Sequence, residues 1–411
     1  MRARTSSFTS GTATSPIGAF EDWCLSRIAG TLQGAQIRVQ LWDGRGVALS
    51  ERMPVATVVV RDRGTLVRLL YRTDLEFGEA YAAGRLDVQG DLVAALDSIN
   101  RAVGFRPFQR RRARAGRIPL SSSRHNVHTH YDLGNAFYRL WLDEQMLYTC
   151  AYFETPDATL ETAQRAKMDH VCRKLRLRPG EHVVEAGCGW GALALHMARY
   201  YGVTVRAFNI SANQLEYARA HAQAQGLSDR VTFVDGDYRA IDERADAFVS
   251  VGMLEHVGRH NYTDLGAVID RVIDPVHGRG LLHFIGRNAP LKLSAWIDRH
   301  VFPGAYPPSL GEVLPGVLES RWLSVTDVEN LRLHYALTLK HWLARFEDQA
   351  GTVREMFDEA FVRTWRLYLA GSQAAFQCGD MQLFQVTFGR PLDSTQPWTR
   401  RDLYEAVDAA V

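Results

Sequence analysis

The segment EAGCGWG at 185–191 constrains the fold of this chain more than any other feature. It follows the apolar residues Val183 and Val184 and precedes a run with helical periodicity that continues to Tyr201. Two glycines in it let the backbone turn sharply with no side chain between the chain and a ligand. The spacing G-x-G-x-G differs from the G-x-G-x-x-G of dinucleotide-binding folds. An acid at 185 can meet an amino or hydroxyl group, so the motif favours a ligand site at a strand–helix junction over an ordinary tight turn.

Strands and helices alternate in the larger, C-terminal part of the chain, which we assign as one domain over residues 124–411. This βαβ alternation predicts an α/β fold with a parallel, doubly wound sheet. The region Gly286–Leu343 does not fit the alternation, and its Trp, Phe, Leu and Pro content predicts a helical insertion over the strand ends, where such folds bind ligands. Strands are predicted at Val183–Glu185, Val203–Phe208, Val231–Val234, Ala247–Val251, Gly280–Ile285 and Gln382–Phe388, and helices up to Tyr201, at Ala212–Gln225 and at Val353–Gln373.

Residues 20–105 are predicted to form a small α+β domain. The composition of Ile37–Trp42, Val55–Val60 and Leu66–Tyr71 is typical of strands, whereas Leu75–Ala102 reads as helices broken near two glycines. Residues 1–19 are predicted to be a disordered tail, because the N-terminus lacks the apolar core of a secretory signal. No apolar run approaches the roughly 18 residues that span a bilayer.

Seven arginines, with no acid among them, lie between residues 101 and 117, although the net charge of the chain is only +2. A solvated basic linker over 106–123 and a patch for anionic lipid headgroups are both open; such a surface contributes about 1 kcal/mol per basic side chain. Nucleic acid is disfavoured, because no aromatic–basic motif accompanies the run. The arginines are Arg101, Arg106, Arg110, Arg111, Arg112, Arg114 and Arg117.

The five cysteines show no paired spacing. They predict reduced thiols in a cytoplasmic protein and no disulfide framework. A zinc site made of Cys150, Glu255 and His283 is disfavoured for the same reason, so that no metal is expected.

Polar residues follow the next two strands of the predicted sheet. Asn209 ends one strand, and Ser211 with Gln214 has the spacing of a capping box, which needs no ligand. Asp237 and Tyr238 follow the strand after that, where an acid could take an adenine amino group or form a surface turn.

Several stretches, taken together and in this order, resemble the cyclopropane-fatty-acid synthases and the related mycolic acid cyclopropane synthases. The resemblance covers roughly Arg124 to Arg390; the stretch FGEAY at 77–81 is more weakly similar to the lipid-associated domain of longer family members. It implies a Rossmann-like class I methyltransferase with a helical lipid-binding insertion. The stretches are HYDLGN at 130–135, YTCAYF at 148–153, the glycine motif, VGMLEHVG at 251–258, LLHFIG at 281–286, Tyr335 with Thr338, Leu339 and Trp342, and Gln382 with Gln385.

The resemblance also implies two cofactors, S-adenosylmethionine (SAM) and bicarbonate. Glu185 stands where the family usually has Asp, and Asn209 where many methyltransferases place an acid for the ribose hydroxyls. Protonated His283, Tyr335 and backbone N–H groups would offset the buried anion, with Glu255 fixing its protons. The implied SAM residues are Tyr148, Thr149, Glu185, Gly187, Gly189, Gly191, Asn209, Gln214, Asp237 and Tyr238, and the implied bicarbonate residues are Cys150, Glu255, His283, Ile285 and Tyr335.

The implied reaction moves a methylene unit from SAM to the double bond of an unsaturated phospholipid acyl chain, which forms a cyclopropane ring. Aromatic faces can stabilise the cationic intermediate, and Tyr152, Phe284, Tyr335 and Trp342 are the candidates. Three alternatives stay open: methylene or methyl branching, a small-molecule N- or C-methyltransferase, and a non-catalytic lipid-binding protein. The implied location is the cytoplasm, peripheral to the inner face of an anionic membrane, with a homodimer as one open arrangement.

Overall fold

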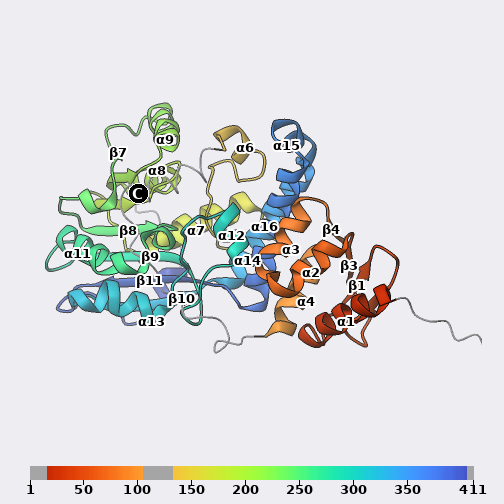
Figure 1. Cartoon of the computed structure of the whole chain (residues 1–411). Helices are drawn as coiled ribbons and strands as arrows, with labels where there is room; N and C mark the ends of the chain where they lie inside the picture. The colour runs from red at the N-terminus through yellow and green to blue at the C-terminus, as the bar shows by residue number, and fades with distance from the viewer. Residues whose placement is uncertain (1–15, 105–132, 405–411) are drawn as a thin grey trace, which may run out of the picture. The chain divides into compact units, whose positions relative to one another are not determined.

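The computed structural model describes residues 16–104 and 133–404, and the chain divides into two compact units, Met1–Val103 and Gly104–Val411 (Figure 1). The first fifteen residues of the expected tail, the basic linker and the start of the HYDLGN stretch lie outside the described residues, as do six of the seven arginines. None of the helices in the described ranges combines the length and apolarity that crossing a membrane requires.

The N-terminal unit is built on a four-stranded sheet in the order β2-β1-β3-β4. Alternate residues of β1 and β3 are buried, which gives the sheet its apolar face. β1 and β3 pair in parallel, and the two outer pairs are antiparallel. The elements are α1 (Pro16–Thr31), β1 (Ile37–Leu41), β2 (Gly46–Ala48), β3 (Ala56–Val60), α2 (Arg63–Tyr71), α3 (Thr73–Ala82), β4 (Leu86–Gly90) and α4 (Leu92–Val103).

Two predictions for this unit are wrong in detail. The strand predicted at Leu66–Tyr71 belongs to helix α2, because the Asp62 side chain accepts a hydrogen bond from the Thr65 N–H at 2.8 Å and caps the helix. The helices predicted across Leu75–Ala102 are interrupted by β4, whose pairing with β3 is a contact between distant parts of the chain. The predicted α+β class of the unit is confirmed.

The C-terminal unit contains a seven-stranded sheet in the order β10-β11-β9-β8-β5-β6-β7. The strands from β7 to β9 pair in parallel, and β11 and β10 continue the sheet antiparallel. This confirms the predicted doubly wound α/β fold. The strands are β5 (His182–Ala186), β6 (Thr204–Asn209), β7 (Val231–Asp235), β8 (Ala247–Val251), β9 (Arg279–Gly286), β10 (Ser324–Asn330) and β11 (Gln382–Gly389).

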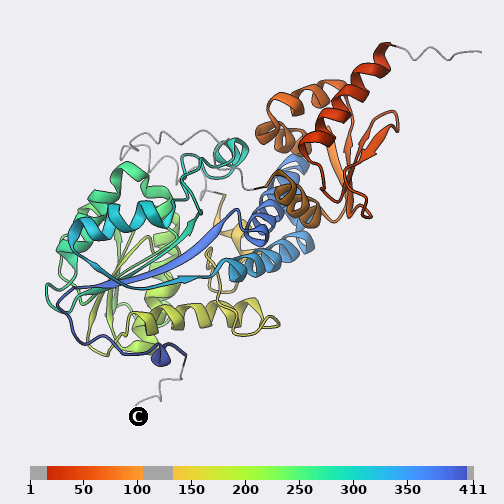
Figure 2. The same ribbon diagram turned by 90° about the horizontal axis from the view of Figure 1, so that it is seen from below.

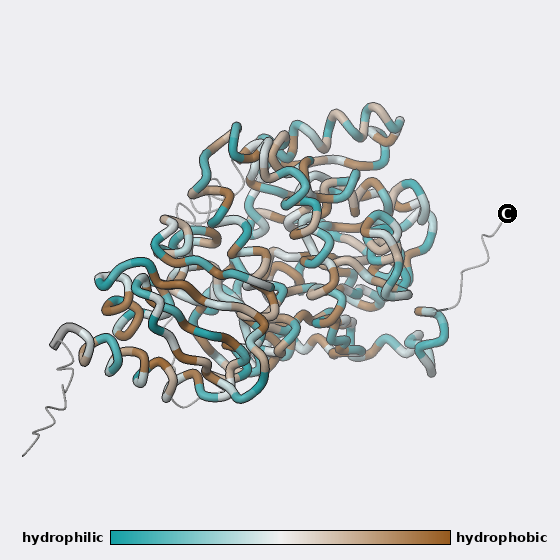
Figure 3. The backbone as a smooth tube through the Cα atoms, turned by 90° about the vertical axis from the view of Figure 1, so that its right-hand side faces the viewer, coloured by the Kyte–Doolittle hydropathy of each residue, from teal (hydrophilic) through white to brown (hydrophobic). Residues whose placement is uncertain are grey.

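Each face of this sheet has its own apolar core, with helices on both sides (Figure 2). Val183, Val249 and Leu281 face helices α7 (Leu160–Lys174), α8 (Ala192–Tyr201) and α9 (Ala212–Ala224). The alternate strand residues Val184, Phe248 and Leu282 face the side of α11 (Tyr262–Val272). Hydrophobic and hydrophilic segments accordingly alternate along the chain (Figure 3).

The region 286–343, predicted to be a helical insertion, contains both helices and a strand. β10 was missed because it is a polar edge strand, SVTDVEN, whose residues alternate only between exposed and partly buried. The predicted helix Val353–Gln373 is two helices, because the Asp358 side chain accepts from the Phe361 N–H and begins α16. The remaining elements are α6 (Asn135–Arg139), η1 (Tyr238–Ala240), α10 (Leu254–Val257), η2 (Arg259–Asn261), α12 (Ala295–His300), α13 (Leu310–Val313), η3 (Leu314–Leu318), η4 (Glu319–Arg321), α14 (Arg332–Asp348), α15 (Ala350–Met356), α16 (Glu359–Cys378) and α17 (Arg401–Tyr404).

Candidate active site

The glycine segment forms the turn between β5 and α8. Gly187 and Gly191 have φ angles of 85° and 86°, which residues with a side chain rarely adopt. A Cβ atom on Gly187 would lie 3.0 Å from the Cβ of Met253, which follows β8. The turn therefore requires glycine both for its backbone angles and for the space beside the next strand.

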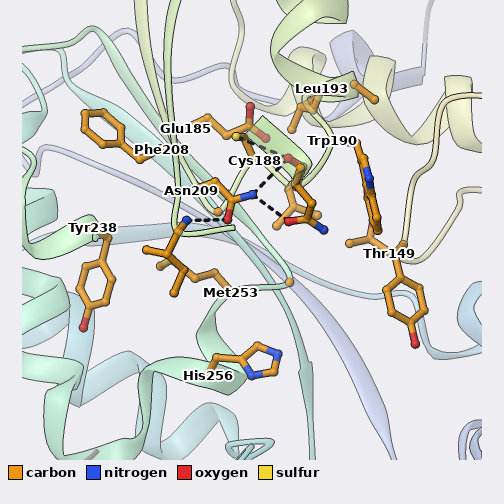
Figure 4. A pocket seen from close by; sticks show the side chains of 18 of the residues that line it. Thr149, Glu185, Cys188, Trp190, Leu193, Phe208, Asn209, Tyr238, Met253 and His256 are labelled. Carbon is orange, nitrogen blue, oxygen red and sulfur yellow. Dashed lines mark hydrogen bonds between the residues drawn. The ribbon is translucent and has the colours of Figure 1, made fainter. Parts of the chain in front are cut away.

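A pocket opens at this turn, over the carboxyl ends of the parallel strands (Figure 4). Of the ten residues predicted to bind the cofactor, Gly191 alone lies outside the lining of this pocket. A Cβ there would be 2.6 Å from the Cζ of Phe233, so that Gly191 allows α8 to pack closely on the sheet. Nine of the predicted residues do line the pocket: Tyr148, Thr149, Glu185, Gly187, Gly189, Asn209, Gln214, Asp237 and Tyr238.

The side chain of Asn209 joins the ends of β5 and β6 (Figure 4). Its Nδ2 donates to the Gly189 carbonyl at 3.1 Å and to the Gln214 Oε1 at 2.8 Å, and its Oδ1 accepts from the Ile210 N–H. Ser211 caps α9 by accepting from the Gln214 N–H. Asn209 thus holds the glycine turn in place through hydrogen bonds that an acid could not donate.

Asp237 has a local structural role in addition to its place in the pocket. Its side chain accepts from the Arg239 N–H at 3.0 Å and pairs with the Arg239 guanidinium at 3.3 Å. These contacts fix the turn after β7 and hold Tyr238 against the pocket.

Glu185 is buried at the base of the pocket with one oxygen, Oε2, that has no hydrogen-bond partner. Burial raises the pKa of this carboxyl to about 8, an effect that the nearby Lys167 partly opposes. A buried carboxylate is costly unless donors surround it. The position therefore suits a ligand with a cationic or N–H group.

Several other lining residues were not predicted from the sequence, among them Lys167, Trp190, Met253 and His256. The sequence spacing could have identified Lys167, because it lies four residues from Ala163 and from Val171, on the apolar face of α7. A lysine in such a stripe is expected to have a partner or a function.

The five predicted bicarbonate residues converge around the carboxyl end of β9, and we call them the β9 cluster. The Ile285 N–H donates to Glu255 Oε1 at 2.5 Å. Ile285 is paired with Leu383 of β11, whose carbonyl accepts from the Leu331 N–H. The Leu331 carbonyl in turn accepts from the Tyr335 N–H at 3.2 Å and contacts the Cys150 Sγ at 4.0 Å. One chain of short contacts thus links residues from five distant segments, four of which supply the members of the cluster.

His283 completes the β9 cluster two residues before Ile285, on the same face of β9. Gln385 Nε2 donates to His283 Nδ1 at 3.1 Å in the assigned amide orientation, which places the ring proton on Nε2. Burial lowers the pKa of His283 well below its usual value. This lowered pKa disfavours the protonated His283 that we expected and favours the neutral imidazole.

Two buried polar atoms of the β9 cluster have no hydrogen-bond partner, Glu255 Oε2 and His283 Nε2. Burial raises the pKa of Glu255 to about 7, and the Ile285 N–H partly opposes this. Burial also raises the pKa of the Cys150 thiol. The cluster consequently offers an uncharged N–H donor, a carboxyl oxygen and a thiol. In the described ranges, no three His, Cys, Asp or Glu side chains are placed to hold a metal ion.

Aromatic rings connect the β9 cluster with the pocket. Tyr335 lies 5.9 Å from Trp342, and Trp342 lies 5.4 Å from Tyr148 of the pocket lining, between ring centroids. The other two candidates for stabilising a cation are elsewhere. Tyr152 stacks on His170, and Phe284 packs in the core on the opposite face of the sheet.

The comparisons with known proteins agree with this architecture. The family model described as mycolic acid cyclopropane synthetase matches residues 120–386, and a domain of unknown function, DUF7884, matches residues 25–104. A probable fatty acid methyltransferase of Pseudomonas putida is 38% identical over 90% of this chain and 96% of its own length. The cyclopropane-fatty-acyl-phospholipid synthase of Escherichia coli is 34% identical over 87% of this chain and 94% of its own.

A solved structure shows the same likeness. The mycolic acid cyclopropane synthase CmaA1, complexed with S-adenosylhomocysteine (SAH) and CTAB, is 31% identical with a TM-score of 0.62, over 65% of this chain and 98% of its own. A parallel sheet with an antiparallel β11 and a pocket at the glycine turn defines a class I methyltransferase. The chain belongs to the mycolic acid cyclopropane synthetase family, as a SAM-dependent methyltransferase of the cyclopropane-fatty-acid synthase type.

Proposed function

We propose that this enzyme transfers a methylene unit from SAM to the double bond of an unsaturated phospholipid acyl chain and forms a cyclopropane fatty acid. The observation that carries the proposal is the pair of unpartnered buried atoms, Glu255 Oε2 and His283 Nε2, in a cluster joined by aromatic rings to the pocket. The Escherichia coli relative, which matches 87% of this chain, is named for this chemistry, and the Pseudomonas putida relative is named as a probable fatty acid methyltransferase.

SAM would bind in the pocket at the glycine turn. Gly187 and Gly189 leave room for the ligand beside the backbone, and the unpartnered Oε2 of Glu185 would accept from its amino group. Tyr148, Thr149, Asn209, Gln214, Asp237 and Tyr238 complete the proposed lining, and Gly191 supports it through packing.

Bicarbonate fits the β9 cluster by its donor set. His283 Nε2–H is a donor for an oxyanion, and Glu255 Oε2 is an acceptor for the hydroxyl of the same ion. Cys150 and the backbone N–H of Tyr335 both contact the Leu331 carbonyl, and the backbone N–H of Ile285 donates to Glu255. SAM would supply an electrophilic methyl group, and bicarbonate the base that removes a proton from it so that the ring closes.

The side chains of this protein would position the alkene and stabilise the positive charge that develops on it. A buried aromatic wall holds the alkene in place without water, so much of the rate comes from positioning. The rings of Tyr335 and Trp342 stabilise the positive charge that develops on the acyl chain. Glu255 and His283 would hold the bicarbonate base in a fixed position. This favours removal of a proton from the transferred methyl group over removal of a proton from the acyl chain.

The test is expression in a bacterium with unsaturated phospholipids, followed by mass spectrometry and proton NMR of the fatty acids. A gain of one CH2 with ring protons in the NMR spectrum supports the proposal. The same gain with vinylidene protons would instead indicate methylene branching. No lipid product, with methylation of an amine panel, would overturn both.

We also propose a cytoplasmic enzyme that docks peripherally on the anionic inner face of the membrane, with a homodimer as its assembly. Support for docking comes from the arginine run, of which only Arg101 lies in the described residues, paired with Asp97 at 2.7 Å. Replacing Arg110, Arg111 and Arg112 by Ala should weaken binding to anionic vesicles and leave SAH affinity unchanged, and salt should weaken the wild type similarly. Equal vesicle binding by the triple variant would contradict docking through this run. Light scattering would determine whether the protein forms a homodimer in solution.

A further inference from the structure

Helix α7 holds the chain segment that leads to Cys150. Gln164 Nε2 donates to the carbonyls of Leu147 and Thr149, at 3.3 and 2.9 Å. One turn later, Lys167 Nζ donates to Thr149 Oγ1 at 2.8 Å. Two residues of one helix face therefore fix a segment that lines the pocket.

Lys167 has fewer partners than a buried ammonium group requires. The residue is 1% exposed, and its Nζ carries three donors, of which one has a partner. Within the described ranges, no carboxylate lies inside the 4.0 Å ion-pair distance of this nitrogen. Because burying an unpaired charge is costly, the remaining donors point to a missing acceptor rather than to a finished packing arrangement.

That acceptor is expected in the pocket, because Lys167 is part of its lining together with Glu185. Burial lowers the pKa of Lys167 to about 8, while Asp143, Cys150 and Glu185 act in the opposite direction. An anionic ligand group beside Nζ would favour the protonated form further. Lys167 is thus a buried base that a bound anion would keep charged.

Lys167 and Glu185, an amine and a carboxyl group, lie in the same pocket wall, and neither provides the other's missing hydrogen-bond partner. Glu185 Oε2 is without a hydrogen-bond partner, and the two groups form no ion pair. A ligand with an ammonium and a carboxylate group on one carbon would satisfy both. An α-amino acid end has that chemistry.

We propose that Lys167 binds the α-carboxylate of the methionine portion of SAM, so that the pocket distinguishes ligands with this carboxylate from ligands without it. The proposal rests on the proposed SAM pocket and adds the group that recognises one end of the ligand. A role limited to holding Thr149 would require no ligand carboxylate.

The test compares two ligands that differ only in the carboxylate: SAH and its decarboxylated analogue, the adenosyl thioether of 3-aminopropanethiol. Charge-assisted hydrogen bonds are strong enough that the wild type should bind SAH at least about tenfold more tightly. In Lys167→Met this ratio should fall to within about twofold. Lys174→Met is the matched control, since Lys174 is a buried lysine of the same helix that pairs with Glu329 at 2.5 Å and lies outside this pocket; it should keep the wild-type ratio.

An unchanged ratio in Lys167→Met would overturn the proposal. If that variant does not fold, Lys167→Gln gives the same readout, because it also removes the charge. Loss of affinity for both ligands by the same factor would assign Lys167 to support of Thr149 and would likewise overturn the proposal. Absence of SAH binding by the wild type is a separate outcome and refutes the SAM pocket itself.

Discussion

The proposed SAM pocket and the β9 cluster use different parts of the same sheet and are assembled in different ways. The pocket takes most of its residues from short segments at the ends of neighbouring parallel strands, such as 185–189, 209–214 and 237–238. The β9 cluster takes one or two residues from each of four distant segments, and antiparallel pairing of β9 with β11 brings them together. Local turns therefore determine the pocket, whereas tertiary pairing determines the cluster.

This difference predicts that the two sites can be damaged separately. Glu255→Gln should have the largest effect, because it replaces the unpartnered Oε2 by a donor and removes the charge. We expect kcat to fall by about 1,000-fold, in the range seen when an essential oriented group is removed. SAH affinity by calorimetry should stay within about threefold of wild type. A parallel loss of SAH binding would show that the sites are one unit.

The raised pKa of Glu255, about 7 against 4.5 for the ordinary carboxyl, predicts a pH-dependent cost to stability. The folded state binds this proton more tightly, so the favourable contribution is complete below about pH 4.5 and is lost as the pH rises through about 7. The loss amounts to roughly 3 kcal/mol. Relative to wild type, Glu255→Gln should therefore gain unfolding free energy between about pH 5 and pH 8. Denaturant titrations that show a constant difference would contradict the burial of an ionisable Glu255.

Gly187→Val tests the pocket side of the comparison. The change places a branched side chain at a φ of 85°, against Met253, beside the proposed ligand. SAH affinity should fall by about 30-fold or more. Gly351→Val is the control, because a Cβ at Gly351 meets nothing within 4 Å; it should bind SAH as wild type does. Undiminished SAH affinity in Gly187→Val would show that the ligand does not bind at this turn.

Gly191→Ala separates packing from ligand contact within the same motif and should have the smallest effect. The new Cβ meets Phe233 and Ala218 at a φ of 86°, so we expect a loss of about 1–2 kcal/mol in unfolding free energy. SAH affinity of the folded protein should change by less than about threefold. A larger loss of SAH affinity without a loss of stability would show that Gly191 contributes directly to ligand binding.

Much of the fold and the pocket could be predicted because their signals are local. Glycine spacing after an apolar strand and the polar residues at strand ends identified seven pocket residues, whereas Tyr148 and Thr149 came from the family resemblance. Strands β4 and β10 were missed because their pairing partners are distant and their composition is polar. The β9 cluster could be proposed only from the family resemblance, since no short spacing links its members.

Burial explains what the sequence could not give at the sites themselves. The predicted protonation of His283 is disfavoured, because burial lowers its pKa, and the charges of Lys167 and Lys174, from a distant helix, act in the same direction. Lys167 was overlooked because a lysine in a helix is usually exposed. Both residues acquire their chemistry from neighbours that the fold supplies.

The dependence of the reaction on bicarbonate tests the account of the β9 cluster most directly. Wild-type enzyme, assayed in carbonate-depleted buffer with SAM and unsaturated phospholipid vesicles, should lose most of its activity and regain it when bicarbonate is added. A metal chelator should leave the restored rate unchanged. Full activity in the depleted buffer would contradict the assignment of Glu255 and His283 to a bound oxyanion.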